Sequence, residues 1–255
     1  MVHPWQFQAD PEWAAALVVA AVDYAVVVRA LGRRGTPTSK TRKAVFAAGL
    51  VLIAVALLSP LEHIALTSLL SVHLLQNVIL ADWAPPLLVL GLSPAMVAAA
   101  ERHRVVRAVT NPAVALTYWL AAWYGLHLPG VYGYALTHRW ALGVEHLVFL
   151  SSGIVFWWPV LSPSRMRPGS ALVYLFAAFV AASPVSLALA LTHPQYSFYI
   201  HAPRLWGISP LEDQQLGAIG MAIEQAAILF TACSIMFFRI LAEDETGDAG
   251  VGLGA

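Results

Sequence analysis

Long apolar stretches, separated by short polar or charged segments, dominate the pattern of the chain. A helix needs about 20 apolar residues to cross a bilayer, and seven stretches approach that length. They cover residues 13–31, 44–60, 64–84, 112–128, 141–161, 171–191 and 215–238. The pattern predicts an all-α, polytopic membrane bundle of seven transmembrane helices in a single domain, residues 1–242. A flexible acidic and glycine-rich tail, residues 243–255, follows it.

The apolar run from Ile64 to Ala100 is too long for a single span. Pro85 and Pro86 lie inside it, and each proline removes a backbone donor and restricts the residue before it. We therefore expect the helix to break there. The piece after the break, residues 87–100, reaches only about 21 Å at roughly 1.5 Å per residue, so we expect residues 87–107 to form a short helix or re-entrant segment on the cytoplasmic side.

The distribution of basic residues predicts the orientation, because Lys and Arg in short loops stay in the cytoplasm. With seven spans and the N-terminus outside, only Arg139 and Arg204 of the 14 basic residues lie on the outer side. Residues 1–13 carry no Lys or Arg, which indicates a reverse anchor and not a cleaved signal peptide. We expect the C-terminus in the cytoplasm.

Composition narrows the function classes. The chain is 59% hydrophobic and 11% charged, which excludes a water-soluble enzyme, and its 14 basic and 14 acidic residues leave no surplus for a nucleic acid. The single cysteine, Cys233, excludes a disulfide framework and a Cys-x-x-Cys motif. Any metal must therefore be held by His, Met, carboxylate or amide groups.

Polar residues at membrane depth are costly and are functional candidates by default. His73, Gln76 and Asn77 are spaced so that they share one helix face. This face could handle a metal ion or a proton, since neutral imidazole is the commonest metal ligand. The alternative is that these residues form hydrogen bonds between helices of the bundle.

Two further polar groups lie on other spans. His127 and the pair Glu145-His146 lie near outer helix ends, where His residues are often merely interfacial. Counted from the predicted helix ends at about 1.5 Å per residue, His127 is near the surface, His146 roughly 8 Å deep and His73 roughly 16 Å deep. We therefore expect an outer site at His127 and His146, with His73 in a deeper polar layer.

The seventh span carries a polar stripe that faces protein and not lipid. Asp213 lies at its start, where the helix dipole favours a carboxylate. Gln214, Gly217, Met221 and Glu224 or Gln225 recur at three- and four-residue steps along one face. Glu224 is expected at roughly the depth of His73, so the deeper layer comprises His73, Gln76, Asn77 and Glu224.

These blocks together resemble a known family. They are Ser59-Pro60-Leu61, His73-x-x-Gln76, Ala84-Pro85-Pro86-Leu87 with Gly91 and Pro94, His127-x-Pro129, Glu145-His146, Phe156-Trp157-x-Pro159 and Asp213-Gln214-Gln215-x-Gly217-x-x-x-Met221. In order and spacing they resemble the CtaG-like family of seven-span assembly factors for caa-type cytochrome c oxidase. The resemblance extends from about residue 5 to residue 238.

The resemblance implies a non-catalytic role in maturing a haem-copper oxidase in a bacterial plasma membrane, with copper delivered from the outer side. Its implied partners are the oxidase subunits and a copper chaperone. The family's ligand positions fall on His73, His127 and His146, with Asp213 and Met221 as nearby donors. Gln76, Asn77, Glu145, Gln214 and Glu224 form the supporting polar layer. This chain has Asn77 where relatives usually have His, and an amide is a poorer copper ligand than imidazole.

Three alternatives stay open at this point. The protein could be a metal-free scaffold for oxidase assembly. It could be a b-type haem protein, which needs two His at matched depth on facing helices. It could also be a transporter or proton channel built around Asp23, His73, Asp82 and Glu224, although the sequence shows no internal repeat.

Overall fold

The computed structural model describes residues 5–7, 10–162 and 166–251, with side chains up to residue 243. Every regular element in this part of the chain is helical. The elements are α1 (Pro11–Arg33), α2 (Lys40–Leu57), α3 (Pro60–Thr67), α4 (Leu70–Val78), η1 (Ile79–Trp83), α5 (Ala84–Gly91), α6 (Pro94–Ala100), α7 (Arg104–Val109), α8 (Pro112–Leu126), α9 (Pro129–Thr137), α10 (Arg139–Leu161), α11 (Pro168–Leu191), α12 (Ser197–His201) and α13 (Pro210–Val251).

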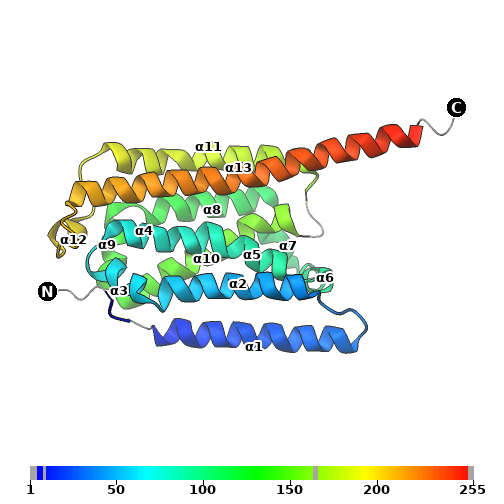
Figure 1. Ribbon diagram of the computed structural model, residues 1–255, viewed down its shortest axis with the longest axis horizontal. Helices are drawn as coiled ribbons and strands as arrows, with labels where there is room; N and C mark the ends of the chain where they lie inside the picture. The colour runs from blue at the N-terminus through cyan, green and yellow to red at the C-terminus, as the bar shows by residue number, and fades with distance from the viewer. Residues whose placement is uncertain (1–4, 8–9, 163–165, 252–255) are drawn as a thin grey trace.

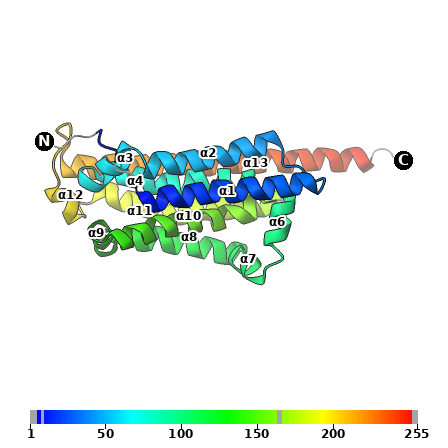
Figure 2. The ribbon, with the colours of Figure 1, turned by 90° about the horizontal axis from the view of Figure 1, so that it is seen from below.

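The long helices run side by side along one axis, and the short helices lie at the ends of the bundle. The N-terminus lies at the end that carries α3, α9 and α12, and the C-terminus lies at the opposite end, beyond α6 and α7 (Figures 1 and 2). Helix α1 lies at the edge of the bundle, while α4, η1, α5 and α10 form its centre. The described elements confirm the predicted all-helical fold, and the long apolar helices among them support a multi-pass membrane protein.

By the criteria of helix length and hydropathy, the structure contains fewer candidate spans than the seven predicted from the sequence. Five described helices are long and apolar enough to cross a membrane, or up to six if α2 and α3, which meet at 44°, form one bent span. The predicted span 112–128 corresponds to α8, which has 15 residues. At about 1.5 Å per residue this helix is only about 22 Å long.

The predicted break at Pro85 and Pro86 is wrong. A continuous candidate span runs from Leu70 to Gly91, and both prolines lie in the first turn of α5, directly after the π-helical turn η1. The carbonyl of Ala81 is the one that the missing N–H of Pro85 leaves without its helical donor. Gly153 of α10 packs onto this carbonyl so closely that a Cβ there would lie 2.2 Å from the Ala81 oxygen.

The correction shifts the whole third span. Its helix starts at Leu70 instead of residue 64 and ends at Gly91 instead of residue 84. Of the segment 87–107, which we predicted to be a separate cytoplasmic-side helix or re-entrant piece, residues 87–91 complete the span. The rest includes the short helices α6 and α7. At the other end of the chain, α13 continues as helix to Val251, through most of the predicted tail.

Candidate functional site

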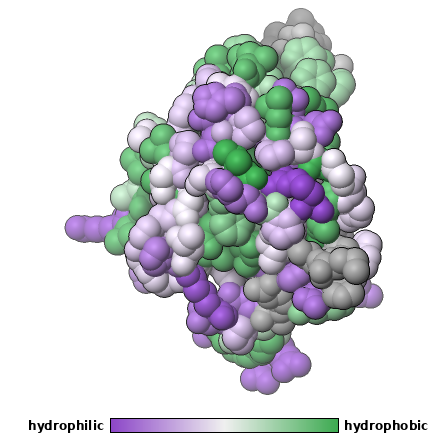
Figure 3. Space-filling model, turned by 90° about the vertical axis from the view of Figure 1, so that its left-hand side faces the viewer, coloured by the Kyte–Doolittle hydropathy of each residue, from purple (hydrophilic) through white to green (hydrophobic). Residues whose placement is uncertain are grey.

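Three buried histidines lie near the end of the bundle that carries α3, α9 and α12. His73 is in the first turn of α4, His127 is the C-cap of α8, and His146 lies two turns into α10. Their side chains are at most 6% exposed. Because α4 starts at Leu70, the predicted position of His73, roughly 16 Å from the helix end, is wrong. The three imidazoles therefore belong to one polar end, whose surface also shows hydrophilic side chains (Figure 3).

A tyrosine fixes the orientation of His73. The His73 Nδ1 lies 2.8 Å from the Tyr199 hydroxyl, and this hydroxyl donates its proton to the backbone oxygen of Ala65 at 2.6 Å. Burial raises the pKa of Tyr199 well above its usual value, so the phenol keeps that proton. Since the proton is already donated, Nδ1 of His73 must be the donor in the first contact. In the neutral ring, Nε2 then carries a free lone pair.

The free nitrogen of His73 faces a carboxylate. Its Nε2 lies 3.6 Å from Oε1 of Glu145, a side chain that is only 1% exposed. The amide nitrogen of Asn77 donates to the same Oε1 at 3.2 Å, which holds the carboxylate in place. Two acceptor atoms that face each other repel unless a proton or a metal cation lies between them. The pair can therefore share a proton or lie on either side of a metal cation.

The other two histidines also present free nitrogens. Nδ1 of His127 lies 2.6 Å from the carbonyl of Trp123, which can only accept, so Nδ1 carries the hydrogen. Nε2 of His127 and Nε2 of His146 are buried without a hydrogen-bond partner. The rings of His73 and His146 lie edge to face with centroids 6.1 Å apart, and Tyr132 contacts both His73 and His127 at 4.8 and 6.4 Å.

The donor set suits copper in kind, because imidazole nitrogen is a good ligand for either copper redox state. Within the described residues, however, no three His, Cys, Asp or Glu side chains lie close enough together to hold a metal ion. The arrangement therefore offers individual free donors, with His73, His146 and Glu145 nearest one another. It does not form a closed structural metal site.

Gln76 points away from this cluster. Its amide nitrogen donates to the carbonyl of Ala56 at 2.6 Å and to Oε2 of Glu62 at 2.7 Å. Glu62 lies in α3, beyond the end of α2, and is 3% exposed. Gln76 therefore joins α4 to α2 and α3 and makes no contact with a histidine.

The Asp-Gln pair at the start of α13 holds two other helix ends. Both oxygens of Asp213 accept backbone N–H groups, from Leu70 at 2.7 Å and from Ser71 at 3.0 Å. Asp213 thus caps α4, which has no capping side chain of its own. The amide nitrogen of Gln214 donates to the carbonyl of Leu189 at 2.8 Å, at the end of α11. Through these hydrogen bonds, Asp213 connects α13 to α4, and Gln214 connects α13 to α11.

Met221 and Glu224 lie deeper and in a different place. Both line a groove of about 410 Å³ between α4 and α13. Oε1 of Glu224 accepts the indole N–H of Trp83 at 2.7 Å, and Asp82 lies close enough for its charge to affect Glu224. The predicted layer that joined Glu224 to His73 is therefore not present; Glu224 belongs to a second buried cluster on η1 and α13.

Comparison with known proteins decides the family. The model of the cytochrome c oxidase caa3 assembly factor family (Caa3_CtaG) matches residues 22–243. The chain belongs to this family. No curated protein and no solved structure matches the chain significantly. The family assignment confirms the resemblance found in the sequence and makes the protein an assembly factor for cytochrome c oxidase.

The site of this family member includes residues that the sequence alone did not single out. Tyr199 orients His73, Tyr196 donates to the carbonyl of His127 at 2.9 Å, and Tyr132 is fully buried between the histidine rings. Their only signal was aromatic side chains near outer helix ends, which is also the pattern of an ordinary interfacial belt.

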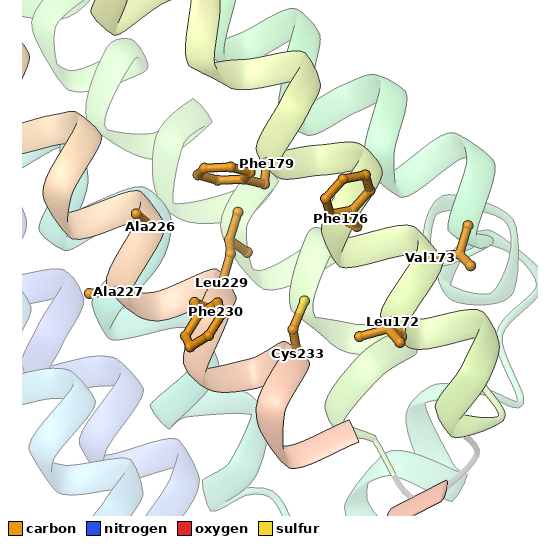
Figure 4. A pocket seen from close by; sticks show the side chains of 9 residues that line it. All are labelled: Leu172, Val173, Phe176, Phe179, Ala226, Ala227, Leu229, Phe230 and Cys233. Atoms are coloured by element: carbon orange, nitrogen blue, oxygen red, sulfur yellow. The ribbon is translucent and has the colours of Figure 1, made fainter. Parts of the chain in front are cut away.

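A large apolar groove is separate from this site. It has a volume of about 740 Å³, lies between α11 and α13, and is lined by apolar side chains such as Phe176, Phe179 and Phe230, together with Cys233 (Figure 4). It offers no set of metal-binding donors, and its apolar walls suit lipid chains.

Proposed function

We propose that this protein assists the maturation of a haem-copper oxidase in the bacterial plasma membrane by holding copper, as cargo, at the buried histidine cluster. It acts by binding and transfer and not as an enzyme. Its partners are the oxidase subunits and a copper chaperone that supplies the metal. The family assignment supports the oxidase as the target.

One observation carries the copper proposal: the free Nε2 atoms of three buried histidines. His73 and His127 are each fixed through Nδ1, by Tyr199 and by the Trp123 carbonyl, which is the usual way in which a protein orients a metal-binding imidazole. His73 and His146 would hold the ion, with Glu145 beside them to balance its charge. An incomplete donor set favours release, which a carrier requires.

The direction of delivery follows from the proposed orientation. Among the described residues, Arg139 and Arg204 are the basic residues at the end with the histidine cluster, while the other described Lys and Arg residues lie in segments at the opposite end. The positive-inside rule then places the cluster on the outer side. The two termini lie at opposite ends of the bundle (Figure 1), which supports an odd number of crossings, such as the seven that we propose.

Copper binding can be tested directly. Purified protein in detergent is titrated with Cu(I) in competition with a chromophoric chelator, beside His73→Ala, His146→Ala and His127→Ala. His201→Ala, an exposed histidine of α12, is the matched control. We expect the first two variants to lose binding, His127→Ala to weaken it, and the control to match the wild type. Equal binding by all four variants would refute the proposal.

A metal-free scaffold is the second candidate. It is favoured by the lack of three converging donors in the described part of the chain. A deletion strain complemented with the His73→Ala, His146→Ala double variant separates the two functions. Copper handling predicts an oxidase that assembles without its full copper content, whereas scaffolding predicts a normal oxidase.

A further inference from the structure

Helix α1 carries an exposed carboxylate in the middle of a membrane span. Asp23 lies twelve residues after Pro11, about 18 Å along a helix that is 23 residues long and has a mean hydropathy of 2.0. Its side chain is exposed, and no hydrogen bond or ion pair connects it to any described residue. A charged side chain at this depth is costly unless it finds a partner.

The two faces of α1 differ in how they are used. The inner face carries Trp13, Leu17 and Tyr24; the Tyr24 ring stacks on Phe46 at 3.8 Å, and its hydroxyl donates to the carbonyl of Gly91 at 2.8 Å. These contacts attach the helix to α2 and α5. Asp23 is one residue from Tyr24, about 100° around the helix, so it lies beside the attachment face, where its side chain is exposed.

The exposed surface of α1 around Asp23 consists mainly of β-branched valine side chains. Val19 and Val26, both 57% exposed, and Val27, 43% exposed, lie three or four residues from Asp23 and so flank it on the helix surface. Small and β-branched residues let helices approach closely in a membrane, and one polar residue among them supplies an interhelical hydrogen bond. The face thus has the composition of a helix-packing surface.

A second copy of the chain does not fit as the occupant. A symmetric contact through this face would bring two Asp23 carboxylates together. Among the described residues, no Lys or Arg lies at the same depth: Arg29, the nearest one in α1, is six residues and about 9 Å further towards the helix end. A second copy therefore offers no cation at this depth, which favours a different membrane protein as the source of the complementary group.

We propose that the face of α1 around Asp23 is the docking surface for a transmembrane helix of the oxidase subunit, and that Asp23 pairs there with a cationic or hydrogen-bond-donating side chain. The proposal rests on the role of the protein in oxidase assembly, and it is independent of copper binding. It also explains why α1 is the least embedded long helix: one of its faces is left for the partner.

Site-specific photocrosslinking tests the surface. A benzophenone amino acid replaces Val26 in α1 or, as a matched control, Val173 in α11, which is 68% exposed on another face. Each variant is expressed with an affinity-tagged oxidase and irradiated, and the purified oxidase is analysed by mass spectrometry. We expect an adduct between an oxidase subunit and position 26 but not position 173. An adduct of position 26 with a second copy of the chain, or equal adducts at both positions, would overturn the proposal.

The variant Asp23→Val tests the carboxylate itself. We expect co-purification with the oxidase to fall about five- to thirtyfold, the range that one interhelical hydrogen bond provides. Stability in detergent and copper binding should be unchanged, because Asp23 contacts no described residue and lies outside the histidine cluster. A loss of stability would reveal an internal partner and overturn the proposal. Failure of copper binding in the wild type would instead contradict the copper proposal and leave this one standing.

Discussion

Asp213 provides the sharpest test of the site, because the family resemblance and the structure assign it different roles. The resemblance predicts a donor near copper, whereas in the structure both of its oxygens cap α4 through Leu70 and Ser71. Replacement by alanine removes both acceptors and leaves two backbone N–H groups at the start of a mostly buried helix. The structure therefore predicts that Asp213→Ala lowers the free energy of unfolding.

The magnitude follows from the two bonds. A hydrogen bond to a charged group contributes about 1.5–3 kcal/mol. Ser71 is only half-buried, so we take the lower half of this range and expect Asp213→Ala to cost about 3–4 kcal/mol. Asp213→Asn keeps one acceptor oxygen and should cost roughly half as much. Glu212→Ala, one residue away and exposed, is the control and should have a far smaller effect.

Reversible unfolding in mixed micelles, followed by tryptophan fluorescence as the SDS fraction rises, measures these free energies. The order of stability should be wild type, then Asp213→Asn, then Asp213→Ala. Copper affinity measured on the folded fraction should stay close to that of the wild type. If Asp213→Ala unfolds at the same SDS fraction as the wild type and yet loses copper binding, the capping role is refuted and Asp213 is a copper ligand.

Three further changes probe the packing, the pH dependence and the histidine cluster. Gly153→Ala should destabilise the bundle by about 1–3 kcal/mol, since its Cβ would lie 2.2 Å from the backbone oxygen of Ala81; unchanged unfolding would contradict this contact. Burial raises the pKa of Glu62 from 4.5 to about 7, so its share of the stability is full below about pH 4.5 and is lost as the pH rises through 7. The unfolding midpoint of Glu62→Gln should therefore equal that of the wild type at about pH 5 and be higher than it at about pH 8. If the unfolding midpoints of both proteins depend on pH in the same way, the raised pKa of Glu62 is contradicted. Tyr199→Phe leaves Nδ1–H of His73 unpaired and should lower copper affinity about 10–100-fold in the chelator competition, whereas wild-type affinity would show that the tyrosine does not orient the ring.

The sequence predicts the helical membrane architecture well because bilayer crossing imposes a strong and local constraint. A continuous apolar run of about 20 residues is helical there, since a helix satisfies all of its backbone hydrogen bonds within the one segment. The same constraint marks embedded polar residues, and His73, Glu145 and His146 do come together in the structure. They were identified as polar side chains on apolar spans, although the predicted depth of His73 was wrong.

The sequence-based predictions that were wrong concern features that depend on contacts between distant segments of the chain. Pro85 does not end its helix, because a π-helical turn precedes it and Gly153 of another helix packs on the carbonyl left free. The start of this helix was also misplaced: α3 ends at Thr67 and α4 begins at Leu70, which puts His73 in the first turn of the span. Asp213 shows the same limit: a carboxylate at a helix start suits its own helix dipole, and only the fold shows that it caps a different helix.

The contacts of Asn77 remove the apparent conflict with the family pattern. The resemblance leads us to expect His at this position, but Asn77 donates a hydrogen bond to Oε1 of Glu145 at 3.2 Å. A histidine N–H can make the same bond. The side chain at position 77 must donate a hydrogen bond that keeps the Glu145 carboxylate facing Nε2 of His73. The amide of Asn77 can do this. The substitution then leaves the pair of His73 and Glu145 intact, so the loss of one imidazole is no reason to exclude copper.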